Sequence, residues 1–194
     1  RSMLAPARIF EREARFFEQA QPLIPDITAN CLYAAIDTEN DDYLLLLEDL
    51  SDMREGDQLN GCSVDDASSA LEALAKLHST FWGDDNLANF DWLPSINSEG
   101  MRVGSEVYKQ SLPGFLEAFG SSVDPENGNL VQRFGENVYQ LLDRLAAMPL
   151  TVCHMDYRAD NLFFGSDGSV KMIDFQTFSR HGHAEDVGYF ISQN

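Results

Sequence analysis

The chain has 194 residues, 44% of them hydrophobic, which is enough to bury the core of one domain or of two small lobes. Its 13 Lys and Arg face 32 Asp and Glu, and the net charge of −19 argues against nucleic acid as a partner, because phosphate backbones are bound through clustered cations. Three cysteines without metal-ligand spacing, no apolar run of bilayer length and no secretory pattern together predict a cytoplasmic protein with reduced thiols and no membrane contact.

The amino-terminal part predicts a helix and then a strand. Residues 9–20 carry Phe10, Ala14 and Phe17 at helical spacing, so we expect a helix there. Residues 43–50 begin with the apolar run from Tyr43 to Leu47 and end in acidic residues, which is typical of a buried strand that leads into a loop.

The middle of the chain is expected to be helical. Ser63 to Asp66 resembles a capping box and opens a helix that should reach about Trp82. Residues 83–100 are rich in Asp, Asn and Ser and predict a loop. Helices are then expected over residues 101–110, 113–119 and 127–147, with Pro113 at a start because proline suits a first turn and breaks an interior.

The carboxy-terminal part predicts short strands around a polar loop. Residues 150–153 are expected to enter this loop as a strand and residues 161–164 to leave it as another. The turn Gly165–Gly168 and the alternating residues 169–173 then complete a hairpin. This hairpin should bring Asp174 back beside Asn161.

The loop carries the residue types that phosphoryl transfer requires. Such a reaction depends on holding a nucleotide, a metal and an acceptor hydroxyl in line while charge is neutralised. The Asp156 carboxylate can accept the acceptor's proton. The oxygens of Asn161 and Asp174 are hard ligands of the kind that magnesium prefers. The order Asp, Asn, Asp therefore predicts a kinase-type active site.

The segment from Val152 to Phe190 resembles the aminoglycoside phosphotransferase and choline kinase group of small-molecule kinases, within the protein-kinase-like superfamily. Met155 stands where protein kinases have Arg, and Gln176 stands where they have Gly, which fits the small-molecule branch better. The resemblance implies an α+β, two-lobed fold. Residues 1–50 would be the remnant of the amino-terminal lobe, with a helix, two strands and the hinge, and residues 51–194 the helical carboxy-terminal lobe with the catalytic loop and the metal-binding hairpin.

The resemblance also implies a role for each site residue. Asp156 would be the catalytic base and Arg158 would approach the transferred phosphate, while Asn161 and Asp174 would bind Mg²⁺. His154 and Asp186 would support the loop without touching substrate. The nucleotide would be held by the hinge Glu48, Asp49 and Leu50, whose backbone receives the adenine ring, and by Glu13, or else Glu11, as the partner of a phosphate-binding lysine.

Two elements of such kinases are missing from the sequence. A glycine-rich loop and a strand with the phosphate-binding lysine should precede the helix at residues 9–20. The first lysine is Lys76 and the first glycine is Gly56. The chain also ends within the helix expected after Asp186, so we interpret it as an internal portion of a kinase, whose own activity is left open.

The expected function is transfer of the terminal phosphate of ATP or GTP to a hydroxyl of a small molecule such as an aminoglycoside or choline. The acidic surface would attract a cationic acceptor. The simpler interpretation is that the acidity serves solubility or adaptation to salt. The alternatives are an inactive, nucleotide-binding relative and a metal-dependent hydrolase that uses Asp156, Asp174, His181 and His183. The acceptor, the choice of nucleotide and the oligomeric state stay open.

Overall fold

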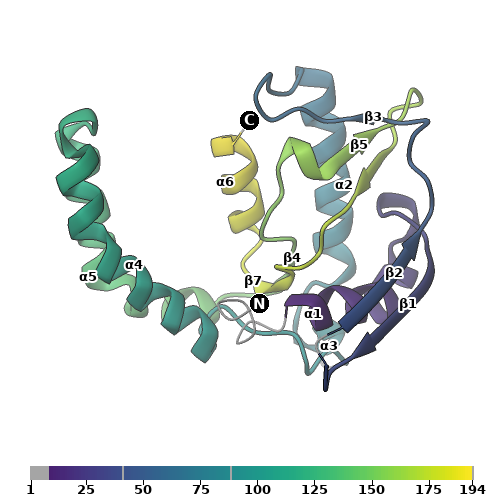
Figure 1. Cartoon of the computed structure of the whole chain (residues 1–194), viewed down its shortest axis with the longest axis horizontal. Coiled ribbons are helices and arrows are strands. Elements are labelled where there is room, and N and C mark those ends of the chain that lie inside the picture. Colours follow the sequence, from purple (N-terminus) through teal and green to yellow (C-terminus); the bar gives the residue numbers. More distant parts are fainter. Residues whose placement is uncertain (1–8, 41, 88, 194) are drawn as a thin grey trace. The chain divides into compact units, whose positions relative to one another are not determined.

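The computed structural model of the chain describes residues 9–40, 42–87 and 89–193. The chain divides into two compact units (Figure 1). The first consists of Arg1–Pro94 and Pro149–Asn194, and the second of Ser95–Met148. Helices and short antiparallel strands are mixed in the first unit, as the predicted α+β class requires. None of the helices in the described ranges is both long and apolar enough to cross a membrane.

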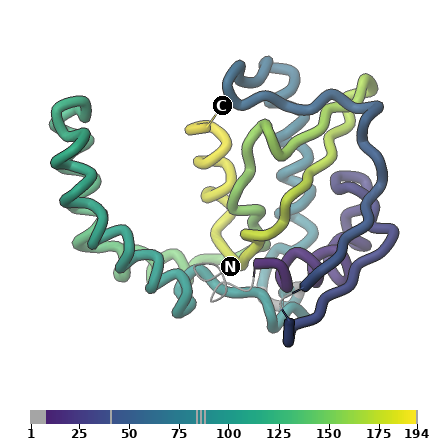
Figure 2. Tube along the Cα trace, in the orientation of Figure 1, coloured from purple at the N-terminus to yellow at the C-terminus, as the bar shows by residue number. Residues whose placement is uncertain are grey.

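The first unit begins with a helix that changes its winding. The α-helix α1 (Ile9–Arg15) continues as a π-helical turn (Phe16–Ala20) and two 3-10 turns (Gln21–Leu23 and Pro25–Ile27). The strands β1 (Cys31–Asp37) and β2 (Asp42–Leu47) follow as an antiparallel ribbon, in which Ala34 pairs with Leu45. This ribbon lies beside α1 in Figure 2, so the predicted helix and strand pack on each other.

Helix α2 (Val64–Thr80) supplies one wall of the main core. Its Ser63 cap accepts a hydrogen bond from the backbone of Asp66 at 3.0 Å, as the capping-box pattern predicts. Leu74 and Leu77 are fully buried on its inner face. The core then continues into the aromatic rings of the amino-terminal turn and the polar loop, where Phe16 stacks on Phe175 with ring centroids 3.6 Å apart.

Short strands hold the carboxy-terminal segment of the first unit. Strand β5 (Leu162–Phe164) lies between β3 (Arg54–Glu55) and β6 (Val170–Met172) in a three-stranded antiparallel sheet. Strand β4 (Thr151–Cys153) pairs with β7 (Ser179–His181). The remaining elements of the unit are the short helix α3 (Asp84–Leu87), the 3-10 turn η6 (Ala159–Asn161) and helix α6 (Ala184–Gln193).

The second unit is a helical hairpin of α4 (Glu99–Phe119) and α5 (Pro125–Ala146), joined by the 3-10 turn Gly120–Ser122. The predicted break at Pro113 is wrong, because α4 runs through this proline. Contacts that α4 makes with α5 shortly before Pro113 explain the continuity. The Tyr108 ring packs on Phe134 with ring centroids 5.2 Å apart, and the Tyr108 hydroxyl donates to the carbonyl of Val131. Tertiary packing outweighs the local cost of the proline.

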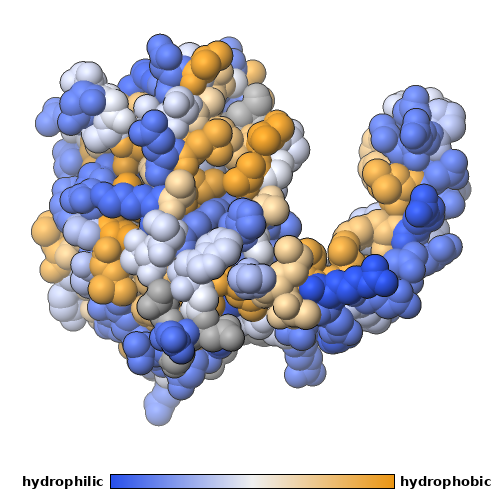
Figure 3. Space-filling model, turned by 180° about the vertical axis from the view of Figure 1, so that it is seen from behind, coloured by the Kyte–Doolittle hydropathy of each residue, from blue (hydrophilic) through white to orange (hydrophobic). Residues whose placement is uncertain are grey.

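Apolar side chains remain on the surface of both units. Orange patches interrupt the hydrophilic blue surface in Figure 3. The exposed apolar side chains include Leu32, Tyr33, Leu44 and Leu46 on the β1–β2 ribbon, and Val103, Val107, Phe115, Phe119 and Leu130 on the hairpin. Each unit thus presents apolar side chains to solvent.

Candidate active site

The predicted polar loop connects β4 to β5 through the turn η6. Strand β4 is completely buried and ends at Cys153, where the loop begins. The loop ends at Asn161, and β5 and β6 then form the predicted hairpin, with Leu162 paired to Met172. The backbone N–H of Ile173 donates to the carbonyl of Asn161 at 3.1 Å. The hairpin therefore brings the residue before Asp174 against Asn161, as predicted.

Two residues at this site have a left-handed backbone. Met155 has a φ of 69° and Asp174 a φ of 63°. Residues other than glycine rarely adopt this conformation, and it costs on the order of 1 kcal/mol. The surrounding hydrogen bonds must hold it, and one joins the two segments, because His154 Nε2 donates to the carbonyl of Ile173 at 2.8 Å. Met155 directly precedes the candidate base Asp156, and Asp174 is itself a candidate metal ligand.

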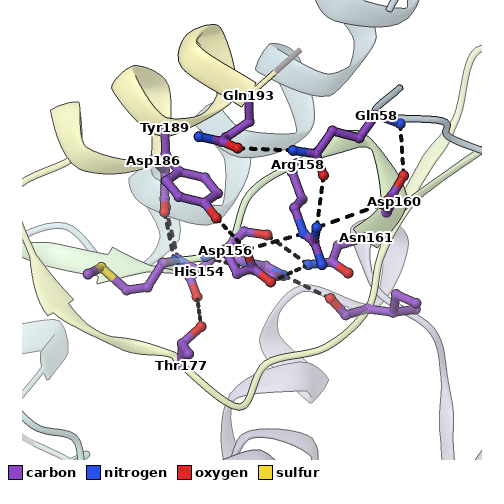
Figure 4. A network of polar contacts seen from close by, with 12 residues as sticks. Gln58, His154, Asp156, Arg158, Asp160, Asn161, Thr177, Asp186, Tyr189 and Gln193 are labelled. Carbon is purple, nitrogen blue, oxygen red and sulfur yellow. Dashed lines mark hydrogen bonds and ion pairs between the residues drawn. The ribbon is translucent and has the colours of Figure 1, made fainter. Parts of the chain in front are cut away.

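The Asp156 carboxylate is held on both of its oxygens (Figure 4). The Tyr189 hydroxyl donates to Oδ1 at 2.8 Å, and Arg158 Nε lies 3.3 Å from the same oxygen. Asn161 Nδ2 donates to Oδ2 at 2.9 Å and to the Asp156 carbonyl at 2.8 Å. Asp156 is 25% exposed, so a candidate base is fixed in orientation while part of it stays accessible.

Arg158 belongs to a wider polar network. Its Nη1 donates to Gln58 Oε1 at 2.8 Å and lies 3.7 Å from Asp160 Oδ2. The Gln58 amide donates in turn to Gln193 Oε1 at 3.0 Å. Arg158 thus lies beside the candidate base, and this is the place at which the resemblance expects it to approach a phosphate.

The loop backbone is anchored on Asp186, at the start of α6. Asp186 is fully buried, and its carboxylate accepts hydrogen bonds from the backbone N–H groups of His154 and Met155 at 2.9 and 2.8 Å. Burial alone would raise the pKa of Asp186, but these bonds and the one from His78 outweigh it and lower the pKa. The carboxylate therefore stays charged. The arrangement fits the supporting role that the resemblance implies for Asp186 and His154.

His78, Cys153 and Asp186 form the one group found within the described ranges whose three potential ligand atoms lie within 4.8 Å of one another. His78 Nε2 is 2.9 Å from Asp186 Oδ2 and 3.9 Å from the Cys153 sulfur. Burial, followed by the charge of Asp186, raises the pKa of the Cys153 thiol far above its ordinary value. A protonated thiol and a carboxylate already engaged in three hydrogen bonds indicate a structural cluster.

Glu13, for which the resemblance implies a phosphate-binding lysine as partner, lies beside Asp174 and Phe175. Its side chain is buried, and its Oε1 accepts a hydrogen bond from the backbone of Phe175 at 3.3 Å. Burial, and then the charge of Asp174, raise the pKa of Glu13 to about 7. The other candidate, Glu11, accepts a hydrogen bond from Arg15 Nε at 2.8 Å. Glu13 is thus the glutamate that the structure places next to the candidate metal ligand.

The lysines of the chain are occupied elsewhere. Lys76 pairs with Asp26, and Lys109, in the second unit, pairs with Glu106. Lys171 donates to the carbonyls of Pro25 and Thr28 and lies 3.4 Å from Glu48 Oε1. No lysine among the described residues pairs with Glu13.

The expected hinge follows β2 directly. The Glu48 carboxylate accepts hydrogen bonds from the backbone and the side chain of Asn30, and its backbone N–H donates to the Asn30 carbonyl. Asp49 and Leu50 turn the chain toward β3: the Asp49 carboxylate accepts from the backbone of Ser51, and the Leu50 carbonyl from that of Met53. The segment is therefore a defined connection, and its contact with adenine stays a prediction.

The donor set at Asn161 and Asp174 fits a magnesium ion. Because Asn161 uses its amide nitrogen on Asp156, its amide oxygen is the group left for a cation. Burial, and then the charge of Asp174, raise the pKa of Glu13, so a second carboxyl group lies beside Asp174. Carboxylate and amide oxygens are ligands of the kind that Mg²⁺ prefers.

The hydrolase alternative depends on His181 and His183. His181 is buried on β7, whereas His183 is exposed near the Trp82 ring, at 5.3 Å between centroids. Among the residues that the structure describes, neither histidine joins Asp156 or Asp174 in a group of potential ligand atoms. The described geometry therefore gives these two histidines no shared ligand group with the candidate carboxylates.

Gln58, Tyr189 and Gln193 belong to the site although no motif in the sequence marks them. The one available signal is the spacing of Asp186, Tyr189 and Gln193, which are three and four residues apart and so share a helix face. Gln58 carries no such signal, because it meets Arg158 across a separation of 100 residues.

Comparison with known proteins agrees with this geometry. The family model of the ecdysteroid kinase-like family (EcKL) matches residues 1–194. The chain belongs to this family. Its kinase-like relatives are small-molecule phosphotransferases, so the resemblance inferred from the loop is confirmed. No curated protein sequence was found to match the chain.

Solved structures establish the fold of this family member. The ADP-bound aminoglycoside phosphotransferase APH(2'')-Ib is 18% identical, with a TM-score of 0.51 over 96% of this chain. The choline kinase LicA from Streptococcus pneumoniae is 10% identical, with a TM-score of 0.53 over 96%. The GDP complex of a mutant aminoglycoside 2'-phosphotransferase-IIIa is 12% identical, with a TM-score of 0.59 over 97%.

The chain spans only part of these structures, namely 60%, 58% and 62% of their respective lengths. At such identities the likeness concerns the fold, and the predicted kinase-like fold is confirmed. The division into two lobes at residue 50 stays a prediction. The two compact units of the chain are separated at other positions, after Pro94 and after Met148.

Proposed function

We propose that this chain carries the catalytic loop and the metal ligands of a phosphotransferase that moves the terminal phosphate of ATP or GTP to a hydroxyl of a small molecule in the cytoplasm. The observation that supports it most is the junction at Asn161. Its side chain bonds to Asp156, and its carbonyl accepts from the residue before Asp174. A candidate base and two candidate metal ligands thus meet at one point, which is the arrangement that phosphoryl transfer requires.

In this proposal each residue acts through a stated atom. Asp156 accepts the proton of the acceptor hydroxyl through the part of its carboxylate that stays accessible. Asn161 and Asp174 hold Mg²⁺ through their side-chain oxygens, and the ion, when bound, neutralises charge on the phosphates. Arg158, beside Asp156, reaches the transferred phosphate from the same side.

The acceptor is proposed from chemistry that the relatives share. The family is described as ecdysteroid kinase-like, and the similar structures include a gentamicin complex and a choline kinase. Each name points to a small molecule with a hydroxyl group. An ecdysteroid, gentamicin and choline therefore form the panel of acceptors with which to begin.

The first test is calorimetric titration of the chain with ATP, with and without Mg²⁺. We expect binding that requires Mg²⁺, an affinity at least about tenfold lower in Asp174→Ala, and a nearly unchanged affinity in Asp156→Asn. Asp167→Ala is the matched control, since this aspartate lies in the exposed β5–β6 turn and bonds only to Ser169 in the contacts described. Equal losses in all three variants would contradict the assigned roles.

The second test separates an enzyme from the nucleotide-binding alternative. That alternative is favoured by one observation, namely that no described lysine pairs with Glu13. Consumption of ATP is measured with each acceptor of the panel. Turnover that depends on an acceptor and disappears in Asp156→Asn supports the enzyme. Binding of ATP that depends on Mg²⁺, without turnover with any acceptor of the panel, would favour a binding protein.

A further inference from the structure

Helix α6 turns one face toward the catalytic loop. Asp186, Tyr189 and Gln193 lie on this face, and each contacts a different part of the site (Figure 4). Asp186 holds the loop backbone at His154 and Met155. Gln193 holds Gln58, which in turn accepts from Arg158. Tyr189, between them, is the member of this face that touches the candidate base.

The contact of Tyr189 leaves room on Asp156 for a substrate. An ionised carboxylate offers about four lone-pair sites on its two oxygens. The phenol and Arg158 Nε lie at Oδ1, and Asn161 Nδ2 takes one site on Oδ2. Among the contacts described, a second lone-pair site on Oδ2 therefore remains for an acceptor hydroxyl. A hydroxyl that bound there would not have to displace Tyr189.

We propose that Tyr189 is a positioning residue, whose hydroxyl holds the Asp156 carboxylate in the rotation in which Oδ2 meets both Asn161 and the acceptor hydroxyl. The proposal rests on the proposed function, since it takes Asp156 as the base. Without the phenol, Oδ1 retains only the longer contact to Arg158, and the carboxylate gains freedom to rotate. Tyr189 is suited to this role because its bond to Asp156, followed by burial, raises its pKa, so the phenol remains a donor.

The first experiment measures side-chain amide hydrogen exchange of Asn161 by NMR in the full chain and in Tyr189→Phe. If the phenol fixes the carboxylate, its loss loosens the bond from Asn161 Nδ2 to Asp156 Oδ2, and exchange should accelerate about fivefold. Tyr108→Phe is the matched control, because it removes a phenol that donates to a backbone carbonyl in the second unit. Unchanged exchange in Tyr189→Phe, or equal acceleration in Tyr108→Phe, overturns the proposal.

A second measurement needs no change at Tyr189. The tyrosine is labelled at Cζ and titrated in the unaltered chain and in Asp156→Asn. The pKa of Tyr189 should fall in the variant, because the negative charge that raises it is gone. An identical titration in both proteins overturns the contact.

Turnover supplies the catalytic readout, with water as the phosphate acceptor and Mg²⁺ with ATP as the donor. In Tyr189→Phe, kcat should fall about tenfold while KM for ATP stays within about twofold. An unchanged kcat overturns the positioning role. The exchange and titration results decide the proposal even where hydrolysis is undetectable, whereas ATP titration decides the proposed function, so the two failures remain distinguishable.

Discussion

The Glu13 carboxyl is buried beside a second carboxylate, and this decides how the fold responds to pH. Burial, followed by the charge of Asp174, raises its pKa from 4.5 to about 7. Below pH 4.5 the carboxyl is protonated in both the folded and the unfolded chain. As the pH rises toward 7, the unfolded chain loses this proton first, so the free energy of unfolding falls. Glu13 thus lowers stability at neutral pH in exchange for its place beside Asp174.

Glu13→Gln should remove this pH dependence, because the amide oxygen still accepts the bond from Phe175 but carries no charge. Relative to the unaltered chain, the variant's free energy of unfolding should improve by about 3 kcal/mol between pH 4 and pH 8. Urea unfolding at both pH values measures it. Glu18→Gln, at an exposed position nearby, is the control and should show no such change. A similar pH trend in both variants would contradict the assignment.

At this scale the sequence predicts the residues whose partners are near in the chain. Asn161 meets the residue before Asp174 because a short hairpin with a glycine turn joins the two segments, and this hairpin is visible in the sequence pattern. Tyr189 meets Asp156 across 33 residues, and the contact depends on how α6 is rotated about its axis. That rotation is fixed by the buried bonds of Asp186, which no local pattern encodes.

At the scale of elements, the sheet β3–β5–β6 and the turn η6 are joined by a close backbone approach at Gly56. The Gly56 N–H donates to the carbonyl of Leu162 at 2.8 Å. A Cβ atom at Gly56 would lie 2.2 Å from the carbonyl oxygen of Ala159, which begins η6. Only glycine lets this segment lie so near the turn that ends in Asn161.

Gly56→Ala should therefore displace η6 and destabilise the first unit by about 2 kcal/mol. Gly188→Ala is the control, because its Cβ would meet nothing within 4 Å and alanine favours the interior of α6 by up to about 1 kcal/mol. Urea unfolding followed by tryptophan fluorescence reports on this unit, since Trp82 and Trp92 both belong to it. Equal stability of the two variants would show that the segment around Gly56 shifts to accommodate the added methyl group.

Helices with a clear apolar stripe could be predicted closely, as α2 shows with its Ser63 cap. The continuity of α4 through Pro113 could not be predicted from the sequence. Local propensity favours a break there, but the packing of Tyr108 against α5 lies outside what a window of sequence contains. Strand β1 likewise has a weak pattern of its own and is defined by its pairing with β2.

At the scale of the whole molecule, a net charge of −19 opposes compaction. Salt screens this repulsion, with a Debye length of about 10 Å at 0.1 M and about 3 Å at 1 M. The acidic surface therefore predicts a fold that is less stable in dilute buffer than in salt, whichever use the protein makes of its charge.

The melting temperature should rise by at least about 2 °C between 10 mM and 0.3 M NaCl, and change little above that. Calorimetry over a salt series measures the trend. Lithium chloride at equal ionic strength is the control and should give the same curve. A rise that continues linearly to high salt would instead indicate exclusion of salt from the surface, and a flat curve would mean that the charges are too dispersed to matter.

The helical hairpin leaves and rejoins the first unit on opposite sides of one strand. The carbonyl of Pro94 accepts a hydrogen bond from Arg180 N at 2.8 Å, and Val152 of β4 pairs with the same Arg180. Neighbouring strands lie about 5 Å apart, so the points of departure and return are roughly 10 Å from each other. Strand β7 therefore holds the first unit together at the two points where its chain is interrupted by residues 95–148, beside the strand from which the candidate loop begins.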